Sequence, residues 1–190
     1  RLERAIASTV SPSMTGLPIQ PIDEELQTLQ REVQRMLGRC LLRLQQYEQL
    51  MKAIVAHHEI SASGSPLESN QAERIADAAN KTLGTLVGTL LGTYVTSGEQ
   101  DEVAEPDAPD NLISFKMKMS LRMSAEDFDT TQNDLKELVL LRNNLVHHFI
   151  DQHDLWSLDG CRGAQESLVA AYSRVDQHFE QLRGWAEHMD

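Results

Sequence analysis

The sequence predicts an all-α protein, folded as an antiparallel four-helix bundle with one short β element. Apolar residues recur every three or four positions over four long stretches, which is the period of an amphipathic helix. Leucine dominates the hydrophobic residues and aromatic residues make up only 5% of the chain, a composition that suits helix packing. One further stretch alternates apolar and polar residues, as a strand does. At 190 residues, the chain is long enough for one domain with a buried core.

Residues 1–20 are predicted to form a flexible N-terminal segment, because they combine Ser, Thr, Pro and Gly without a lasting period. They contain no continuous apolar core, so no signal peptide is expected. The helical domain is expected over residues 21–190. Its first helix is predicted over residues 21–58, since Pro21, Asp23 and Glu24 favour a helix start. Such a helix is longer than a bundle of this size needs, so it could protrude or support a partner.

A loop is predicted over residues 59–67 and a second helix over residues 69–95. In this helix Gly84, Gly88 and Gly92 recur every four residues, which predicts a close helix crossing inside the bundle. The most apolar run, residues 82–95, is too short and too rich in Thr and Gly to span a bilayer. No membrane partner is therefore expected.

Residues 96–111 are predicted to form a solvated acidic loop. This stretch holds six acidic residues, two prolines and no basic residue. A second interpretation is that the loop imitates RNA phosphates and shields a basic site elsewhere on the protein.

The alternating stretch, residues 112–123, is predicted to be a strand, and no second strand of similar quality is evident. A lone strand cannot satisfy its backbone groups, so we expect it to pair with its copy in a homodimer or with a short stretch near Ile60. Lys116, Lys118 and Arg122 fall on one face of this strand. That face is either a solvated surface or a place where an RNA backbone binds.

A helix over residues 124–154 follows, capped by Ser124 and by early carboxylates. Its apolar residues fall on one broad arc: Leu135, Leu138, Val139, Leu141, Leu145, Val146, Phe149 and Ile150. After a turn at residues 155–163, the last helix is predicted over residues 164–189.

Charge and cysteine content limit the classes of function. The net charge of −12 argues against a nonspecific nucleic-acid coat, although it leaves room for a narrow basic cleft. Cys40 and Cys161 lie far apart and in no zinc-binding spacing. They are expected to be reduced thiols of a cytoplasmic protein.

The helix over residues 124–154 also holds the one group of residues that suggests chemistry. Arg142 lies in the middle of its apolar arc, where a guanidinium is costly unless it meets an anion or several acceptors. Asn143, His147 and Asp151 follow at four-residue spacing and should lie in one row. The arrangement fits an anion-binding cation beside a titratable base. It equally fits an arginine that reaches solvent or pairs with a glutamate of another helix.

The run Arg142-Asn143-Asn144-Leu145-Val146-His147 resembles the R-polar-x3-H signature of the HEPN superfamily of small helical bundles, many of which are metal-independent ribonucleases. Three further stretches, residues 37–50, 138–157 and 181–190, resemble the N-terminal helical region of bacterial proteins that carry an OST-HTH/LOTUS domain, and this resemblance would cover roughly residues 21–190. The resemblance implies a HEPN-like bundle that cleaves RNA to 2′,3′-cyclic phosphate and 5′-hydroxyl ends at a dimeric active site. It implies that Arg142 binds the scissile phosphate, that His147 is the general acid or base, and that Asn143 holds the phosphate or orients His147.

Two residues nearby are predicted to support this site. Asp151, one turn after His147, could fix the tautomer of its imidazole, and His148 stands next to it. On an ideal α-helix, however, Arg142 and His147 point about 140° apart. A second copy of the chain would then be needed to complete the site.

Metal binding is the competing chemistry. Its candidate ligands are either His57, His58 and Glu59, or His147, His148, Asp151 and His153. Adjacent histidines on a helix diverge, however, and His147 with Asp151 is only a two-ligand pair. No metal or other cofactor is therefore expected.

The alternative function is non-catalytic. A degenerate HEPN-like domain could dimerise and position an RNA-binding LOTUS domain that lies outside this sequence, and the net charge favours this reading. A role as one half of a toxin–antitoxin or defence module is a third interpretation.

Overall fold

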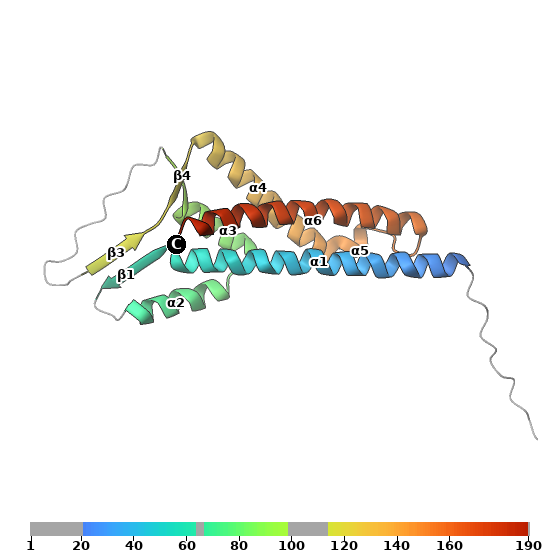
Figure 1. Ribbon diagram of the computed structural model, residues 1–190, viewed down its shortest axis with the longest axis horizontal. Coiled ribbons are helices and arrows are strands. Elements are labelled where there is room, and N and C mark those ends of the chain that lie inside the picture. The colour runs from blue at the N-terminus through green and yellow to red at the C-terminus, as the bar shows by residue number, and fades with distance from the viewer. Residues whose placement is uncertain (1–20, 64–66, 99–113, 190) are drawn as a thin grey trace, which may run out of the picture.

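Helix α1 (Pro21–His57) forms the long axis of the computed structural model, which describes residues 21–63, 67–98 and 114–189 (Figure 1). Its bounds confirm the predicted first helix to within one residue. The predicted N-terminal segment and residues 99–111 of the predicted acidic loop lie outside the described residues. The described fold is predominantly helical, as predicted. No helix within it is long and apolar enough to cross a membrane.

Helix α6 (Leu158–Glu187) lies beside α1 along most of its length and runs in the same direction (Figure 1). Near the beginnings of both helices, Arg162 Nη2 lies 2.8 Å from Glu25 Oε1. Further along both, the rings of Tyr47 and His178 meet edge to face with centroids 6.5 Å apart. Contacts in this order require parallel helices, so the antiparallel order predicted for the first and last helices is wrong.

The parallel order follows from a break in the predicted second helix. The chain forms α2 (Leu67–Ala79) and α3 (Leu83–Thr93) in its place. Helix α2 runs back along α1. A hydrogen bond from the Lys52 ammonium to Ala79 O shows that the end of α2 lies beside α1. Helix α3 then returns to the end of α1. Thr82 stabilises the new start, since its hydroxyl accepts a hydrogen bond from Thr85 N.

The described part of the predicted strand, residues 114–123, forms two short strands rather than one. Strand β3 (Ser114–Lys118) pairs antiparallel with β1 (Glu59–Ser63), with Met117 opposite Ile60. Strand β4 (Leu121–Met123) pairs in parallel with β2 (Val95–Ser97). The predicted pairing near Ile60 is confirmed. The prediction of a single β element is wrong, because the chain changes partner at Met119–Ser120. The predicted loop is wrong over residues 59–63, which form β1.

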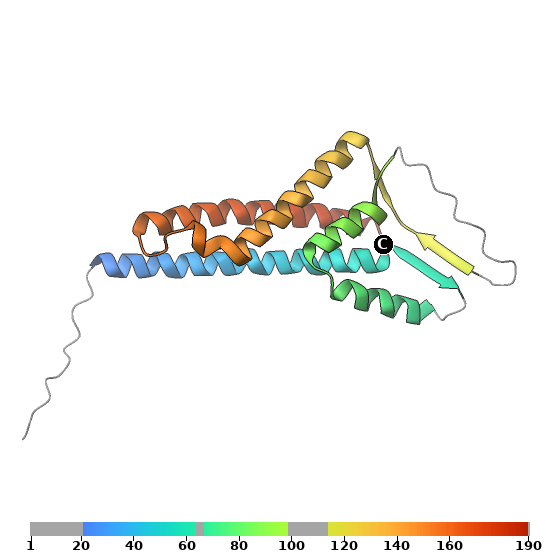
Figure 2. The same cartoon turned by 180° about the vertical axis from the view of Figure 1, so that it is seen from behind.

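Helix α4 (Ala125–Asn143) crosses the α1–α6 pair obliquely and continues through a π-helical turn, η1 (Asn144–His148), into α5 (Phe149–Gln152) (Figure 2). Ser124 caps α4 as predicted, and its hydroxyl accepts a hydrogen bond from Asp127 N at 3.1 Å. Helix α6 begins six residues before its predicted start. The missed signal is Ser157, whose hydroxyl accepts from Gly160 N at 3.1 Å.

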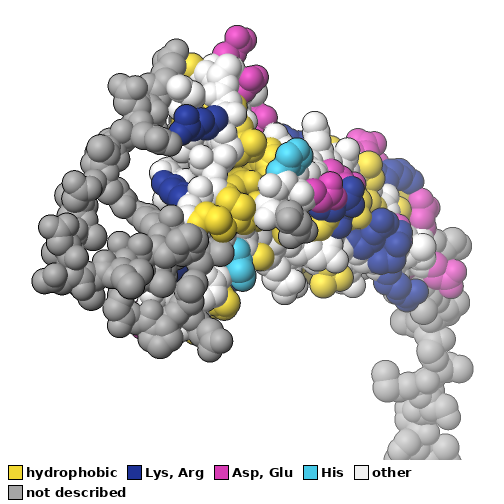
Figure 3. Space-filling view, turned by 60° about the vertical axis from the view of Figure 1, so that its left-hand side comes forward, with side chains coloured by type: hydrophobic (Ala, Val, Ile, Leu, Met, Phe, Trp, Pro, Cys, Tyr) yellow, Lys and Arg dark blue, Asp and Glu magenta, His cyan; other side chains and the backbone are white. Residues whose placement is uncertain are grey.

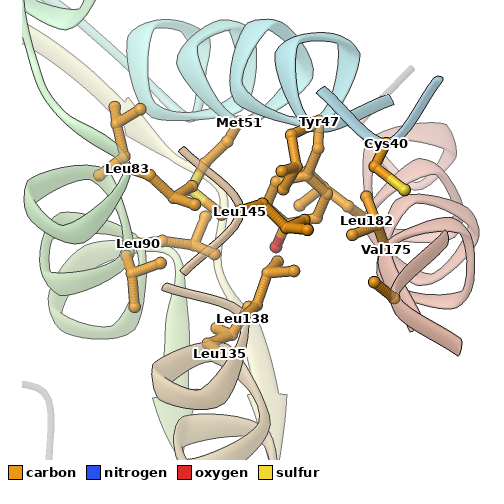
Figure 4. Packing of buried hydrophobic residues seen from close by; sticks show 14 of the residues in the cluster. Cys40, Tyr47, Met51, Leu83, Leu90, Leu135, Leu138, Leu145, Val175 and Leu182 are labelled. Carbon is orange, nitrogen blue, oxygen red and sulfur yellow. The ribbon is translucent and has the colours of Figure 1, made fainter. Parts of the chain in front are cut away.

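One core joins α1, α3, α4 and α6 (Figure 4). Its fully buried side chains converge from all four helices: Tyr47, Met51, Leu83, Leu90, Leu135, Leu138, Leu168 and Leu182. Most of the arc predicted for residues 124–154 faces this core, but Val146 and Ile150 are 44% and 76% exposed. Leu145 and Phe149 on the same turns are buried at 6% and 5%, so Val146 and Ile150 lie on the solvent side of this segment.

Candidate functional site

The π-helical turn brings Arg142 and His147 together. A π-helix bonds each carbonyl to the N–H five residues on, so side chains five apart lie one turn apart on the same side. Arg142 Nη1 accordingly lies 3.4 Å from His147 Nε2. The 140° separation expected on an ideal α-helix is therefore wrong, and one chain alone brings the two groups into contact.

The same guanidinium nitrogen also contacts Asn143, whose Oδ1 accepts from it at 3.2 Å. A guanidinium has only donors, so His147 Nε2 acts as the acceptor, and the proton of the neutral ring is assigned to Nδ1. His147 is exposed, while Arg142 and Asn143 are partly buried. The three predicted catalytic residues thus form one cluster with its imidazole open to solvent.

Glu48 on α1 supplies the anion that Arg142 needs. Its Oε1 lies 3.6 Å from Arg142 Nε, and the two side chains are 22% and 29% exposed. This pairing matches the alternative in which Arg142 meets a glutamate of another helix. It involves the Nε edge of the guanidinium, whereas Nη1 reaches Asn143 and His147. Glu48 therefore offsets the charge of Arg142 and fixes its orientation.

Glu48 was not among the predicted site residues, although the sequence holds a signal for it. It stands between Leu44, Tyr47 and Met51, which are buried at 3% exposure or less. A carboxylate within such a buried stripe needs a cationic partner. The sequence alone could not say that the partner is Arg142.

Of the two predicted supporting residues, His148 meets the ring of His147 edge to face with centroids 6.3 Å apart, whereas Asp151 lies near His148 rather than His147. His148 Nδ1 lies 4.0 Å from Asp151 Oδ2, and these side chains are 57% and 79% exposed. The π-helical turn removes the four-residue row on which the pairing of Asp151 with His147 was predicted. An ion pair this exposed contributes little to stability.

The candidate metal ligands do not converge in the described part of the chain, where no group of three or more His, Cys, Asp or Glu side chains could hold a metal ion. His57 and His58 each direct Nδ1 to a carbonyl of α1, those of Ala53 and Val55, at 2.8 and 2.9 Å. Both cysteines are free and buried.

The predicted basic stripe is divided between two strands. Lys118 ends β3 and Arg122 lies in β4, while for Lys116 only the backbone is described. Figure 3 shows this end of the molecule, where hydrophobic side chains gather and the visible Lys and Arg side chains form separate small groups. Arg122 lies in β4, just before the start of α4, and Arg142 lies near the end of that helix, so roughly 25 Å of helix separates them. A direct extension of the Arg142 cluster by this stripe is therefore not supported.

Comparisons with protein-family models, with curated proteins and with solved structures find no significant match to this chain. The HEPN resemblance thus rests on the sequence motif of residues 142–147 and on the other sequence stretches described above.

Proposed function

We propose that the chain is a HEPN-like helical domain and a metal-independent endoribonuclease, whose site is built on Arg142, Asn143 and His147. The observation that carries the proposal is the 3.4 Å contact between Arg142 Nη1 and His147 Nε2. It joins a guanidinium, which can bind and stabilise a phosphate, to an imidazole, the side chain that most often serves as a general acid or base. The substrate is RNA, and the proposed location is the cytoplasm.

In the proposed reaction, Arg142 Nη1 turns from His147 to a non-bridging oxygen of the scissile phosphate, which is the stronger acceptor. This frees His147 Nε2 to take the proton of the neighbouring ribose 2′-hydroxyl. The 2′-oxygen then bonds to phosphorus, and the bond from phosphorus to the 5′-oxygen breaks. The products are a 2′,3′-cyclic phosphate and a 5′-hydroxyl.

The leaving 5′-oxygen needs a proton from the side opposite the attacking oxygen, because the displacement runs in line. We infer that the His147 of a second copy supplies it, in a homodimer. The support is the exposed apolar surface on the turns that carry the site: Leu140, Val146 and Ile150 are 63%, 44% and 76% exposed. An exposed group of large apolar side chains is typical of a protein interface.

Cleavage of single-stranded RNA in EDTA tests the proposal. We expect the intact chain to cut RNA without metal, and His147→Ala to lower the rate by roughly 10²- to 10⁴-fold through loss of general acid–base catalysis. We expect Arg142→Ala to lower the cleavage rate by about 10²- to 10³-fold, because the guanidinium would no longer stabilise the negative charge that develops on the phosphate.

Matched controls are His188→Ala and Arg183→Ala, which remove the same residue types from the exposed end of α6. They should retain the full rate. Cleavage that persists unchanged in His147→Ala would assign the activity to a contaminant or to another site.

The second candidate function is a non-catalytic scaffold that dimerises and positions an RNA-binding LOTUS domain. The Glu48–Arg142 ion pair favours it, because that pair gives Arg142 a structural role without RNA. The same assay separates the two: a scaffold cuts no RNA in EDTA or in Mg²⁺, and its dimer persists in Arg142→Ala.

A further inference from the structure

His58 is a buried histidine with a nitrogen left over. Its side chain is only 2% exposed, at the end of α1. Nδ1 lies 2.9 Å from Val55 O, a carbonyl of the last helical turn. Within the described part of the chain, Nε2 has no hydrogen-bond partner. A protonated Nε2 would therefore be a buried donor without an acceptor, which is costly.

The backbone at His58 holds the link between β3 and β4. Met119 N donates to His58 O at 2.7 Å, and Leu121 N donates to Tyr94 O at 2.7 Å. The rings of His58 and Tyr94 meet edge to face with centroids 6.2 Å apart. Tyr94 Oη donates to Trp185 O at 3.0 Å, which adds the end of α6. His58 and Tyr94 thus join three helices to the strands at one point.

Charged groups around the ring do little to favour its protonated form. Glu59 follows it on β1 and Arg74 faces it from α2, and these two side chains pair with each other at 3.4 Å. Arg74 also donates to the carbonyls of Val55 and Ala56 at the helix end. Burial is therefore the main effect and holds the pKa of His58 below its ordinary value.

We propose that His58 is a pH-sensitive clasp, which holds the strands against the helices at neutral pH and releases the β3–β4 link when the ring is protonated. Release would expose Met119, Leu121 and Met123, which now pack against the core. The proposal is independent of the ribonuclease function.

Linkage gives the sign and the limit of the effect. A released His58 titrates near the ordinary value of about 6.5, and the clasped ring titrates lower. His58 therefore stabilises the closed β3–β4 link fully above about pH 6.5. This stabilisation decreases as the pH falls toward the lower pKa of the buried ring. Because one proton is taken up, the opening constant rises by at most about tenfold per pH unit.

Amide hydrogen exchange of the full chain between about pH 7.5 and 5 tests this, with rates corrected for the intrinsic effect of pH. We expect protection of the Met119 and Leu121 amides to fall by up to about tenfold per pH unit below pH 6.5. In His58→Phe, which cannot be protonated, protection at Met119 should not vary with pH.

His57→Phe is the matched control, because His57 is the exposed neighbouring histidine, and it should keep the pH dependence. Constant protection in the wild type, or a pH dependence that survives in His58→Phe, would overturn the proposal. If His58→Phe does not fold, the wild type still decides: an NMR titration of the His58 ring with its midpoint at or above 6.5 also overturns it.

Discussion

Arg142 has two sets of contacts, and they lie on different edges of its guanidinium. Nε faces Glu48 at 3.6 Å, and Nη1 faces Asn143 and His147. The first contact makes a partly buried cation tolerable within an apolar helix surface. The second places the Nη1 donor of Arg142 beside the imidazole of His147, and a phosphate oxygen could replace this imidazole as the acceptor. Under the proposed function, Arg142 would stabilise the fold of the free protein and would bind phosphate once RNA is present.

Removing Glu48 should destabilise the fold, because the partly buried charge of Arg142 would lose its anionic partner. We expect Glu48→Ala to lower the free energy of unfolding by about 1–2 kcal/mol, since the pair is only partly screened by solvent. Urea unfolding measures the change.

The control is Glu187→Ala, whose partner Arg183 is exposed and which should change stability by less than about 0.5 kcal/mol. Equal effects of the two substitutions would contradict the role assigned to Glu48.

At the scale of single elements, local features set the helix ends and the site. Three helices begin at a Ser or Thr whose hydroxyl accepts a backbone N–H, at Thr82, Ser124 and Ser157. The π-helical turn at Asn144–His148 is the feature that sequence periodicity could not show, because it inserts one residue into an otherwise helical pattern. It is also the feature that aligns Arg142 with His147.

The cap at Ser157 is expected to be worth about 1 kcal/mol. Ser157→Ala should lower the free energy of unfolding by that amount, because the Gly160 N–H loses its acceptor. Thermal or urea unfolding would detect it.

Ser173→Ala, in the exposed middle of α6, provides the comparison, since alanine favours a helix interior. It should be neutral or slightly stabilising. A Ser157→Ala protein as stable as the wild type would mean that the cap does not fix the start of α6.

Sequence reasoning found the elements with strong local signals and missed those that depend on distant partners. The extent of α1 and the Ser124 cap follow from residues close in sequence. The break before Thr82 was missed because the three-to-four spacing of apolar residues continues across it, although Asn80, Lys81 and Thr82 themselves are polar. The three glycines also misled: a β-carbon on Gly84 would lie 3.7 Å from Val139 Cγ1, but one on Gly88 or Gly92 would meet nothing within 4 Å. The predicted close crossing along all three glycines is therefore wrong.

On the scale of the whole molecule, one additional reversal decides the architecture. Because α2 and α3 replace one long helix, the chain returns to the C-terminal end of α1, and α6 then runs parallel to α1.

The charge of the chain is unevenly distributed along its sequence. Six of the 29 acidic residues lie within residues 99–110, so the net charge of −12 for the whole chain overstates how acidic the helical part is.

Acid should weaken the core through a second histidine, His178 on α6. Burial next to Tyr47 lowers the pKa of His178, helped by Arg174, while Asp134 and Glu137 act in the opposite direction. The unfolded chain then binds the proton more readily, so stability is lost as the pH falls below about 6.5.

Urea unfolding at several pH values tests this. We expect the loss of stability between pH 7 and 5 to be smaller in His178→Phe than in the wild type. His188→Phe, at the exposed end of α6, should keep the wild-type dependence. The same pH dependence in all three proteins would contradict the assignment.

The central claim is that Arg142 and His147 act as one unit on one phosphate, and a double-substitution cycle on single-turnover RNA cleavage in EDTA tests it most directly. We expect Arg142→Ala/His147→Ala to be about as slow as the slower single variant, because each substitution already disables the shared unit. Losses that multiply would mean that the two side chains work at separate places, and no cleavage by the wild type would contradict the ribonuclease function itself.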